Sequence, residues 1–236
     1  MPNKIRKKSE AEIYEIVKYF ENITSLQIVM GIHRTSGTAF AEEKYNQGEN
    51  IRANLISGFL TAITSFEEAI GTRMRKEFCK SEKKAVQYGE FTITIFDGDL
   101  LRIGLITGDL IGDLMKKKCK NFLADYEEKH QRDLENFIGD KEIFSDFSEE
   151  IEKELDVELN YPCKVNPEML DKYDGSRSVR KVLKNMYEMG DVFLPKELVP
   201  ILMREADLTR INAKFYTYDA YSWYVIEPID QDKDSK

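Results

Sequence analysis

The chain has 236 residues and a formal net charge of −8, and 42% of its residues are hydrophobic and 11% aromatic. This composition excludes a chain too polar to bury a core, and the length allows one large domain or two small ones. The negative charge disfavours a chain-wide attraction to nucleic acid or to anionic lipid, so protein partners are expected instead.

The residue types that most often build metal and nucleophilic sites are scarce. Cys79, Cys119 and Cys163 are widely spaced without a CxxC pair, which indicates neither a disulfide framework nor a thiolate metal site and fits a reducing cytosol. His33 and His130 are the only histidines, so a metal site or a histidine-based triad has few candidates. No apolar run reaches the roughly 18 residues of a membrane span. We therefore expect a cytoplasmic protein without cofactor or metal.

The N-terminal segment predicts a short amphipathic helix over residues Ser9–Asn22. Ser9 is followed by Glu12 in a capping-box pattern, and one face carries Ile13, Ile16, Val17 and Phe20. The helix is either docked on its own domain, which its many glutamates favour, or an arm that touches a partner or a membrane surface. The second interpretation depends on the preceding basic cluster, Lys4, Arg6, Lys7 and Lys8.

The next part of the chain predicts a sheet and a central helix. Ser25–Arg34 and Thr38–Tyr45 form a hairpin around a Thr-Ser-Gly turn, and Glu49–Gly71 is a helix with a continuous apolar stripe. Three strands with short connections follow, and an Asp-Gly pair marks one of the turns. These strands are expected at Lys84–Tyr88, Phe91–Phe96 and Leu100–Thr107.

Helical periodicity then returns and continues into a separate C-terminal module. Leu110–Ile138 predicts a long helix, bent or broken in the middle, and Phe144–Leu155 another. After Tyr161-Pro162 three helices and an aromatic-rich hairpin are expected, followed by a disordered charged tail. The helices are Asn166–Lys172, Ser176–Met189 and Pro195–Asp207, and the hairpin strands are Ala213–Tyr218 and Ser222–Glu227.

No pattern of catalytic residues stands out. Gly104, Gly108 and Gly112 lie where a strand passes into a helix, but they lack the spacing of a nucleotide-binding loop. Ser36 and Ser57 precede glycines without a GxSxG context or a histidine in a recognisable relation. Turn and helix-start roles are favoured over a cation site for Asp97, Asp99, Asp109 and Asp113. We predict that the protein is not an enzyme.

A basic face on the second C-terminal helix is the clearest charged feature. Three helices followed by a hairpin is the order of a winged helix, whose third helix reads a DNA groove. Here that third helix carries Glu197, Glu205 and Asp207 beside two cations, which favours a protein-interaction module over DNA binding. The basic face consists of Arg177, Arg180, Lys181 and Lys184.

Residues 23–155 resemble the longin family. "GIHRTSGTAFAEEKY" resembles the first hairpin of that family, "LISGFLTAITSFEEAIG" its first helix and "FTITIFDGDLLRIGLIT" its fourth and fifth strands. Profilin-like, roadblock and PAS-like domains share parts of this plan. The resemblance implies an antiparallel sheet with helices on both faces, and a platform for small GTPases or trafficking factors, often built by pairing two such domains. No SNARE helix follows, so a role in vesicle fusion is not expected.

The predicted fold class is α+β, with a five-stranded antiparallel sheet sandwiched by helices and a small C-terminal module of helices and a β-hairpin. The predicted divisions are an N-terminal helix (1–22), a longin-like domain (23–158), a winged-helix-like module (159–229) and a tail (230–236). An edge strand could add a partner's strand through backbone hydrogen bonds, with Lys84, Val86 and Tyr88 on one face.

The predicted function is that of an adaptor for a small GTPase, a longin- or roadblock-type subunit or a second copy of the chain, in the cytoplasm or at a membrane periphery. A DNA-binding regulator and a small-molecule sensor are the alternatives.

Overall fold

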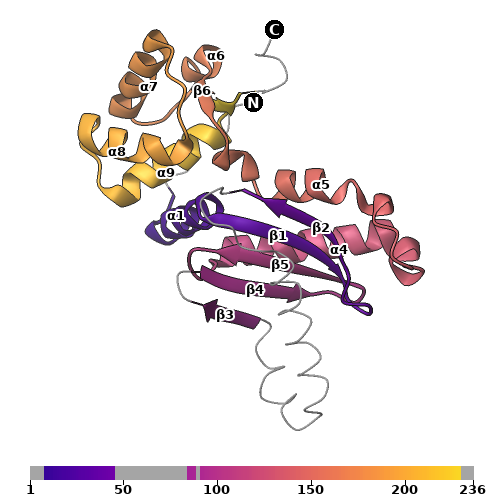
Figure 1. Ribbon diagram of the computed structural model, residues 1–236. Helices are drawn as coiled ribbons and strands as arrows, with labels where there is room; N and C mark the ends of the chain where they lie inside the picture. Colours follow the sequence, from indigo (N-terminus) through magenta and orange to yellow (C-terminus); the bar gives the residue numbers. More distant parts are fainter. Residues whose placement is uncertain (1–7, 46–83, 89–90, 230–236) are drawn as a thin grey trace. The chain divides into compact units, whose positions relative to one another are not determined.

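The computed structural model describes residues 8–45, 84–88 and 91–229, with the side chains of 84–88 left out. The predicted central helix, Glu49–Gly71, lies outside these residues. The chain divides into two compact units, which are described separately (Figure 1). The first comprises Met1–Thr24, Gly112–Leu114 and Asp156–Lys236, and the second comprises Ser25–Ile111 and Met115–Leu155.

The second unit is built on an antiparallel sheet with the strand order β2-β1-β5-β4-β3. Its strands lie within one residue of their predicted positions, because alternating β-branched residues and short turns give unambiguous signals. Their bounds are β1 (Leu26–His33), β2 (Ala39–Lys44), β3 (Lys84–Tyr88), β4 (Phe91–Asp97) and β5 (Leu101–Thr107). Four of the strands are described with side chains, and β3 joins β4 through its backbone register.

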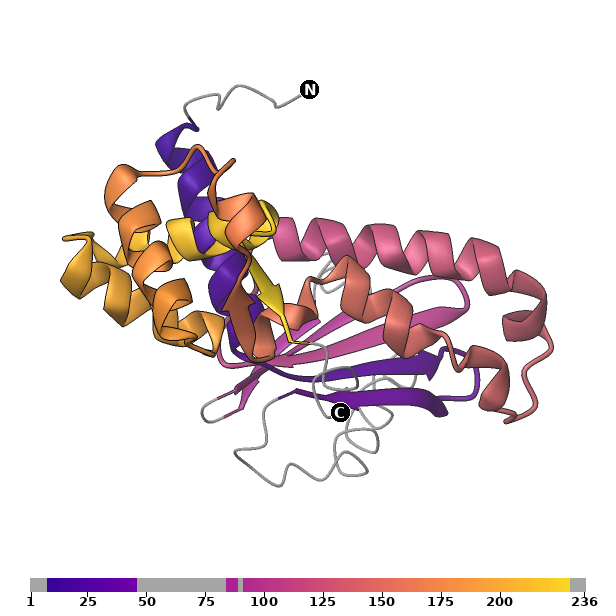
Figure 2. The ribbon, with the colours of Figure 1, turned by 90° about the horizontal axis from the view of Figure 1, so that it is seen from above.

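One face of this sheet is covered by helices α4 (Asp113–Glu135) and α5 (Phe147–Glu154), as Figure 2 shows. Gly31 of β1 faces this layer, since a Cβ there would lie 2.8 Å from the ring of Phe40 and 3.0 Å from that of Phe147. Side chains alternate along a strand, so the neighbours of Gly31 point to the opposite face. That face carries a second apolar cluster, Ile28, Met30, Ile32, Ile93, Ile95 and Ile106.

The long helix is broken near its end, whereas the sequence predicts a bend or break in its middle. His130 has non-helical dihedral angles (φ −108°, ψ 18°) inside α4. A short 3-10 turn, η1 (Glu142–Phe144), then leads into α5. Aromatic rings fill the space between these helices and β2, with ring centroids of Phe40 and Phe144 4.5 Å apart and those of Phe122 and Phe147 5.3 Å apart.

The turn between β4 and β5 is held by a carboxylate from α4. The Glu127 side chain accepts backbone N–H bonds from Asp99 (3.1 Å), Leu100 (2.6 Å) and Leu101 (2.6 Å). Gly98 makes the approach possible, because a Cβ at this position would lie 2.4 Å from the Glu127 carboxylate. Consecutive N–H groups that converge in this way form an anion-binding concavity, here filled from within the chain.

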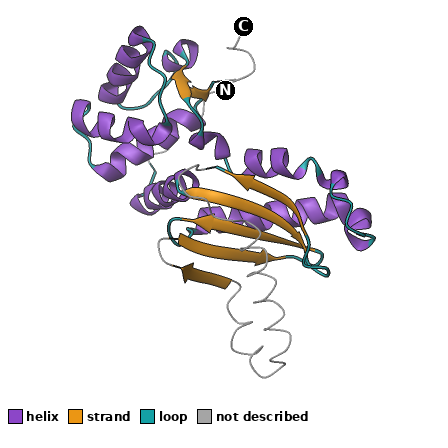
Figure 3. Ribbon diagram, in the orientation of Figure 1, coloured by secondary structure: helices purple, strands orange, loops and turns teal. Residues whose placement is uncertain are grey.

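The first unit is mainly helical (Figure 3). Its first helix, α1 (Glu10–Thr24), begins with the predicted capping box: Ser9 N–H donates to Glu12 (2.7 Å) and Glu12 N–H donates to Ser9 Oγ (3.3 Å). The apolar face of α1 is buried against later parts of the same unit. The elements that contact α1 are η2 (Val157–Asn160) and α9 (Arg210–Ser222). The other elements of this unit are β6 (Cys163–Val165), α6 (Pro167–Leu170), α7 (Arg177–Met189), α8 (Pro195–Glu205) and β7 (Ile226–Pro228).

The predicted fold class needs correction in this unit. The three C-terminal helices are confirmed as α6, α7 and α8, but the predicted hairpin of Ala213–Tyr218 and Ser222–Glu227 is wrong. Most of that segment is helix α9, and the short β7 pairs with β6 to form a separate two-stranded sheet. Within the described residues the chain therefore has two sheets, and helical cover is described on only one face of the larger one.

Helix α9 has local support in the sequence as well as support from packing. Thr209 caps the helix by accepting the Asn212 N–H (3.3 Å), and the buried residues Ala213, Thr217 and Ala220 follow at four- and three-residue steps. Aromatic residues favour strands only where their neighbours provide a pleated surface, and here packing against α1 and α8 decides the outcome.

Candidate functional site

The expected edge strand lies at the rim of the sheet. Within the described strands, β3 has a neighbour on one side only, and its register pairs Lys84 with Ile95, Val86 with Ile93 and Tyr88 with Phe91. This register places Lys84, Val86 and Tyr88 on one face of the strand, as alternation predicts. The opposite rim, β2, lies beside α5, where Ser148 donates a hydrogen bond to Glu43.

Backbone geometry identifies which β3 residues could bind a partner strand. Tyr88 and Phe91 are paired across a connection of two residues, and the closing pair of such a hairpin exchanges both backbone hydrogen bonds. Bonding alternates along an antiparallel pair, so Val86 also bonds inward, while the N–H and C=O groups of Ala85 and Gln87 point away from β4. Lys84, Val86 and Tyr88, which the sequence analysis named, thus share one face of the strand. Ala85 and Gln87, which lie between them, provide the backbone groups that a partner strand could bind.

The basic face of the first unit is also where the sequence places it. Arg177, Arg180, Lys181 and Lys184 are all exposed on α7, and the opposite side of the helix is buried. The ion pair between Lys184 and Glu188 (3.9 Å) is at the surface. Helix α8, the expected DNA-reading helix, has Glu197 bonded to the backbone N–H of Leu194 (2.9 Å) as part of its N-terminal cap.

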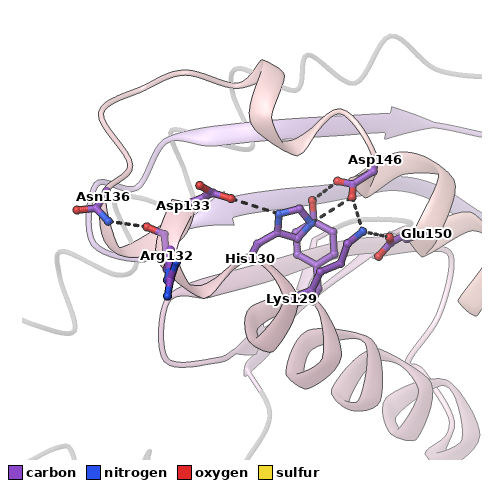
Figure 4. A network of polar contacts seen from close by, with 8 residues as sticks. Lys129, His130, Arg132, Asp133, Asn136, Asp146 and Glu150 are labelled. Atoms are coloured by element: carbon purple, nitrogen blue, oxygen red, sulfur yellow. Dashed lines mark hydrogen bonds and ion pairs between the residues drawn. The ribbon is translucent and has the colours of Figure 1, made fainter.

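The densest polar network joins α4 to α5 and was missed by sequence reasoning (Figure 4). Asp146, which precedes α5, accepts hydrogen bonds from Tyr126 (2.8 Å) and Lys129 (2.6 Å), and His130 Nε2 lies 3.1 Å from it. Lys129 also contacts Glu150. Tyr126, Lys129 and His130 are three and four residues apart, which places them on one side of α4. The carboxylates of Asp146 and Glu150 come from a later segment, and no local sequence pattern predicts that this segment packs against α4.

The pKa values in this network point to a structural role. Burial opposes ionisation of Asp146, but hydrogen bonds from Lys129 and Tyr126 and the charge of His130 outweigh it and lower the pKa of Asp146. Hydrogen bonds to Asp146 and Glu150 raise the pKa of Lys129, and burial followed by the Asp146 contact raises that of Tyr126. A general acid or base works best with a pKa near the operating pH, and each of these shifts moves away from neutrality.

A serine and a histidine do meet, contrary to the sequence-based expectation for Ser36. His33 Nε2 donates to the Leu134 carbonyl (3.0 Å), so its Nδ1 is free to accept from Ser36 Oγ (2.8 Å). Ser36 Oγ also accepts the Thr38 N–H (3.3 Å), and Ser36 N–H donates to the same His33 Nδ1 (3.3 Å). These bonds close the β1–β2 turn. This structural role explains why Ser36 and His33 lie together without invoking catalysis.

The remaining polar candidates also have structural partners. Asp97, the last residue of β4, pairs with Arg102 of β5, and Asp109, which follows β5, accepts the Leu110 N–H (2.7 Å). The Gly108 N–H donates to the Ser25 carbonyl (3.2 Å) and the Gly112 N–H to Asn22 Oδ1 (2.8 Å), so neither is left to cradle a phosphate. Within the described ranges, no group of three or more His, Cys, Asp or Glu side chains could hold a metal ion.

Cys119 and Cys163 are buried free thiols. Burial, with help from Glu154, raises the pKa of Cys119, and burial raises that of Cys163 to about 12. A reactive thiol needs a lowered pKa and access to solvent, so neither cysteine is a nucleophile candidate.

Comparison of the chain with protein-family models, with curated proteins and with solved structures gives no match. No helix in the described part of the chain combines the length and the apolar character needed to span a membrane.

Proposed function

We propose that this chain is a non-enzymatic adaptor or regulator, and that β3 is the place where a partner adds a strand to the sheet. The observation that carries the proposal is the position of β3, which has one neighbour among the described strands and directs the backbone groups of Ala85 and Gln87 away from it. Edge strands of this kind bind extended segments through main-chain hydrogen bonds, and neighbouring side chains select among them.

The class of partner comes from the resemblance to longin domains. It favours a small GTPase, a longin- or roadblock-type subunit, or a second copy of this chain, in the cytoplasm. The order of elements in the second unit, two strands, then three strands, then helices α4 and α5, supports this proposal. The apolar face of α1 is buried, so we do not extend the proposal to a membrane-binding arm.

The alternative, a winged-helix DNA-binding regulator, has lost its main support. The predicted wing is helix α9, and α8 uses one of its acidic residues as a cap. We therefore keep the protein-interaction proposal alone.

The test compares proline and alanine at an outward-facing position. Gln87→Pro removes an N–H that points away from β4 and should leave the β3–β4 pairing intact, and Gln87→Ala is its matched control. Val86→Pro removes an N–H that points toward β4, so it shows how partner binding changes when the β3–β4 pairing itself is disrupted.

The assay has two readouts: sedimentation of the purified chain, and capture of small GTPases from lysate loaded with GDP or with a non-hydrolysable GTP analogue. We expect self-association or nucleotide-dependent GTPase capture by the wild type and by Gln87→Ala, and its loss in Gln87→Pro. If Gln87→Pro binds as well as Gln87→Ala, the edge of β3 is excluded as the binding site. Capture of nucleic acid alone, or of nothing in either readout, would overturn the adaptor proposal.

A further inference from the structure

Helix α7 has a surface that the strand-addition proposal does not use. At about 100° of rotation per residue, Arg177, Arg180, Lys181 and Lys184 fall within an arc of about 100°. The buried residues of the helix form the opposite arc: Val179, Val182, Leu183 and Met186. Packing of that buried side fixes the orientation of the helix in its unit, so the four cations form one outward-facing stripe, which we call the α7 stripe.

The positive charge of the α7 stripe is not neutralised within its unit. Neighbours at three- and four-residue steps along the stripe carry like charges, an arrangement that destabilises a helix. Lys184 contacts Glu188 at 3.9 Å with both side chains well exposed. Arg177, Arg180 and Lys181 have no carboxylate partner in the described part of the chain. Three of the four cations are thus available to an external anion.

The stripe is short and has acidic residues beyond both ends. From Arg177 to Lys184 it spans about 10 Å, at about 1.5 Å per residue. Asp171 and Asp174 precede it, and Glu188 and Asp191 follow it, all four exposed. An extended polyanion such as duplex DNA would be repelled at both ends, whereas a segment with carboxylates over about two helical turns matches the stripe.

An exposed apolar side chain continues the same surface at its C-terminal end. Tyr187 is 48% exposed and lies beside Lys184 and Arg180 on the helix. Tyrosine is enriched in protein interfaces, where it supplies apolar contact area. A phosphate backbone offers no apolar contact to this part of the surface.

We infer that the α7 stripe and its apolar end bind an acidic segment of a partner protein, with carboxylates against Arg177, Arg180 and Lys181 and an apolar residue against Tyr187. The charge complementarity and the matched length of the stripe identify this occupant. The inference deepens the adaptor proposal by giving it a second contact, on a different unit from β3. The two can fail separately, because Gln87→Pro tests only the first contact.

The experiment measures binding of three probes to the full chain. The first is a fluorescein-labelled peptide with glutamates at i, i+3, i+4 and i+7 and a Phe-Leu pair one turn later, with a glutamine version as its control. The others are a short DNA duplex and phosphatidylcholine vesicles with and without phosphatidylserine. The test variant is Arg177→Glu/Arg180→Glu/Lys181→Glu, which should fold well because all three positions are exposed and glutamate is a good helix former.

The matched control variant is Lys196→Glu/Arg204→Glu/Arg210→Glu, which changes the net charge equally with exposed residues of α8 and α9. We expect the stripe variant to weaken peptide binding at least about tenfold and the control to change it less than about twofold. Tyr187→Ser should weaken binding of the glutamate peptide without changing its salt dependence.

Two results would overturn the inference. One is equal peptide binding by the stripe and control variants. The other is binding of DNA or of phosphatidylserine vesicles that exceeds peptide binding and is lost in the stripe variant.

Discussion

Glu127 offers a direct test of how α4 is fixed to the sheet. Its carboxylate accepts N–H bonds from Asp99, Leu100 and Leu101. Glu127→Ala leaves these donors without a partner. The Asp99 N–H is on an exposed residue and can bind water, but those of Leu100 and Leu101 are partly buried. Each buried unsatisfied donor costs about 1–2 kcal/mol, so we expect a loss of about 2–4 kcal/mol in the free energy of unfolding.

The conservative variant should separate hydrogen bonding from charge. Glu127→Gln keeps an oxygen that can accept from Leu100 and Leu101 and loses only the charge, so it should cost about 1 kcal/mol. Glu128 is exposed on the same helix, and Glu128→Ala is the matched control, with an expected change within about 0.5 kcal/mol. Urea unfolding gives the free energies, and hydrogen exchange at the Leu100 and Leu101 amides reports the turn itself.

Gly98 provides an independent check of the same contact. Because a Cβ there would clash with the Glu127 carboxylate, Gly98→Ala should destabilise the wild type and have much less effect in the Glu127→Ala background. The reasoning is refuted if Glu127→Ala costs no more than Glu128→Ala and leaves the two amides equally protected, or if the Gly98→Ala and Glu127→Ala effects add.

Three further predictions concern single residues. Tyr224, just after the C-terminal cap of α9, has φ 56°, a conformation suited to glycine. Tyr224→Gly should therefore raise the free energy of unfolding by up to about 1 kcal/mol in chemical denaturation, and a clear loss would argue against strain there. The lowered pKa of Asp146 means that its charge stabilises the fold above about pH 4 and that this contribution is lost as the pH falls through the lowered pKa. Asp146→Asn should therefore be less stable than wild type at neutral pH, and the difference in unfolding free energy should disappear in acid. A difference that does not change with pH would contradict this prediction. Burial outweighs the Tyr173 hydrogen bond and the Lys8 charge and raises the pKa of Asp219, so this carboxyl favours folding most below about pH 4 and less as the pH rises. As the pH rises from acid to neutral, Asp219→Asn should therefore become more stable relative to wild type. A relative loss of stability over that range would contradict the raised pKa.

The sequence predicted those elements whose signals are local. Strands such as Phe91–Asp97 alternate and end at Asp-Gly turns, and the Ser9–Glu12 capping box marks the start of α1. In α4, the position of the break at His130 needed the structure, because no proline or glycine marks it. Local chemistry therefore located most helices and strands in the described ranges.

The errors occur where distant segments decide the outcome. The aromatic-rich segment at residues 213–218 favours a strand by composition, yet its contacts with α1 and α8 make it helical. The pairing of Cys163–Val165 with Ile226–Pro228 joins segments about sixty residues apart, and neither is long enough to show alternation.

The candidate sites follow the same division between local and distant information. The α7 stripe is a local pattern, and the four cations that the sequence places on one helix face are exposed on α7. The outward backbone groups of Ala85 and Gln87 depend on the pairing of Tyr88 with Phe91 across a turn, and the Asp146 network on the approach of α5 to α4. Neither could be read from spacing along the chain.

The pairing of α1 with α9 has a consequence during synthesis of the protein. Ile23 is fully buried, Tyr19 packs its ring edge-on against Tyr218, and Glu21 pairs with Lys214, so α1 is completed by a helix that is made long after it. At about 5–20 residues per second, the ribosome needs about 10–40 seconds to reach α9 after it has made α1. During that time the apolar side of α1 lacks its native cover, and a chaperone that recognises short amphipathic helices has its best opportunity to bind the nascent chain.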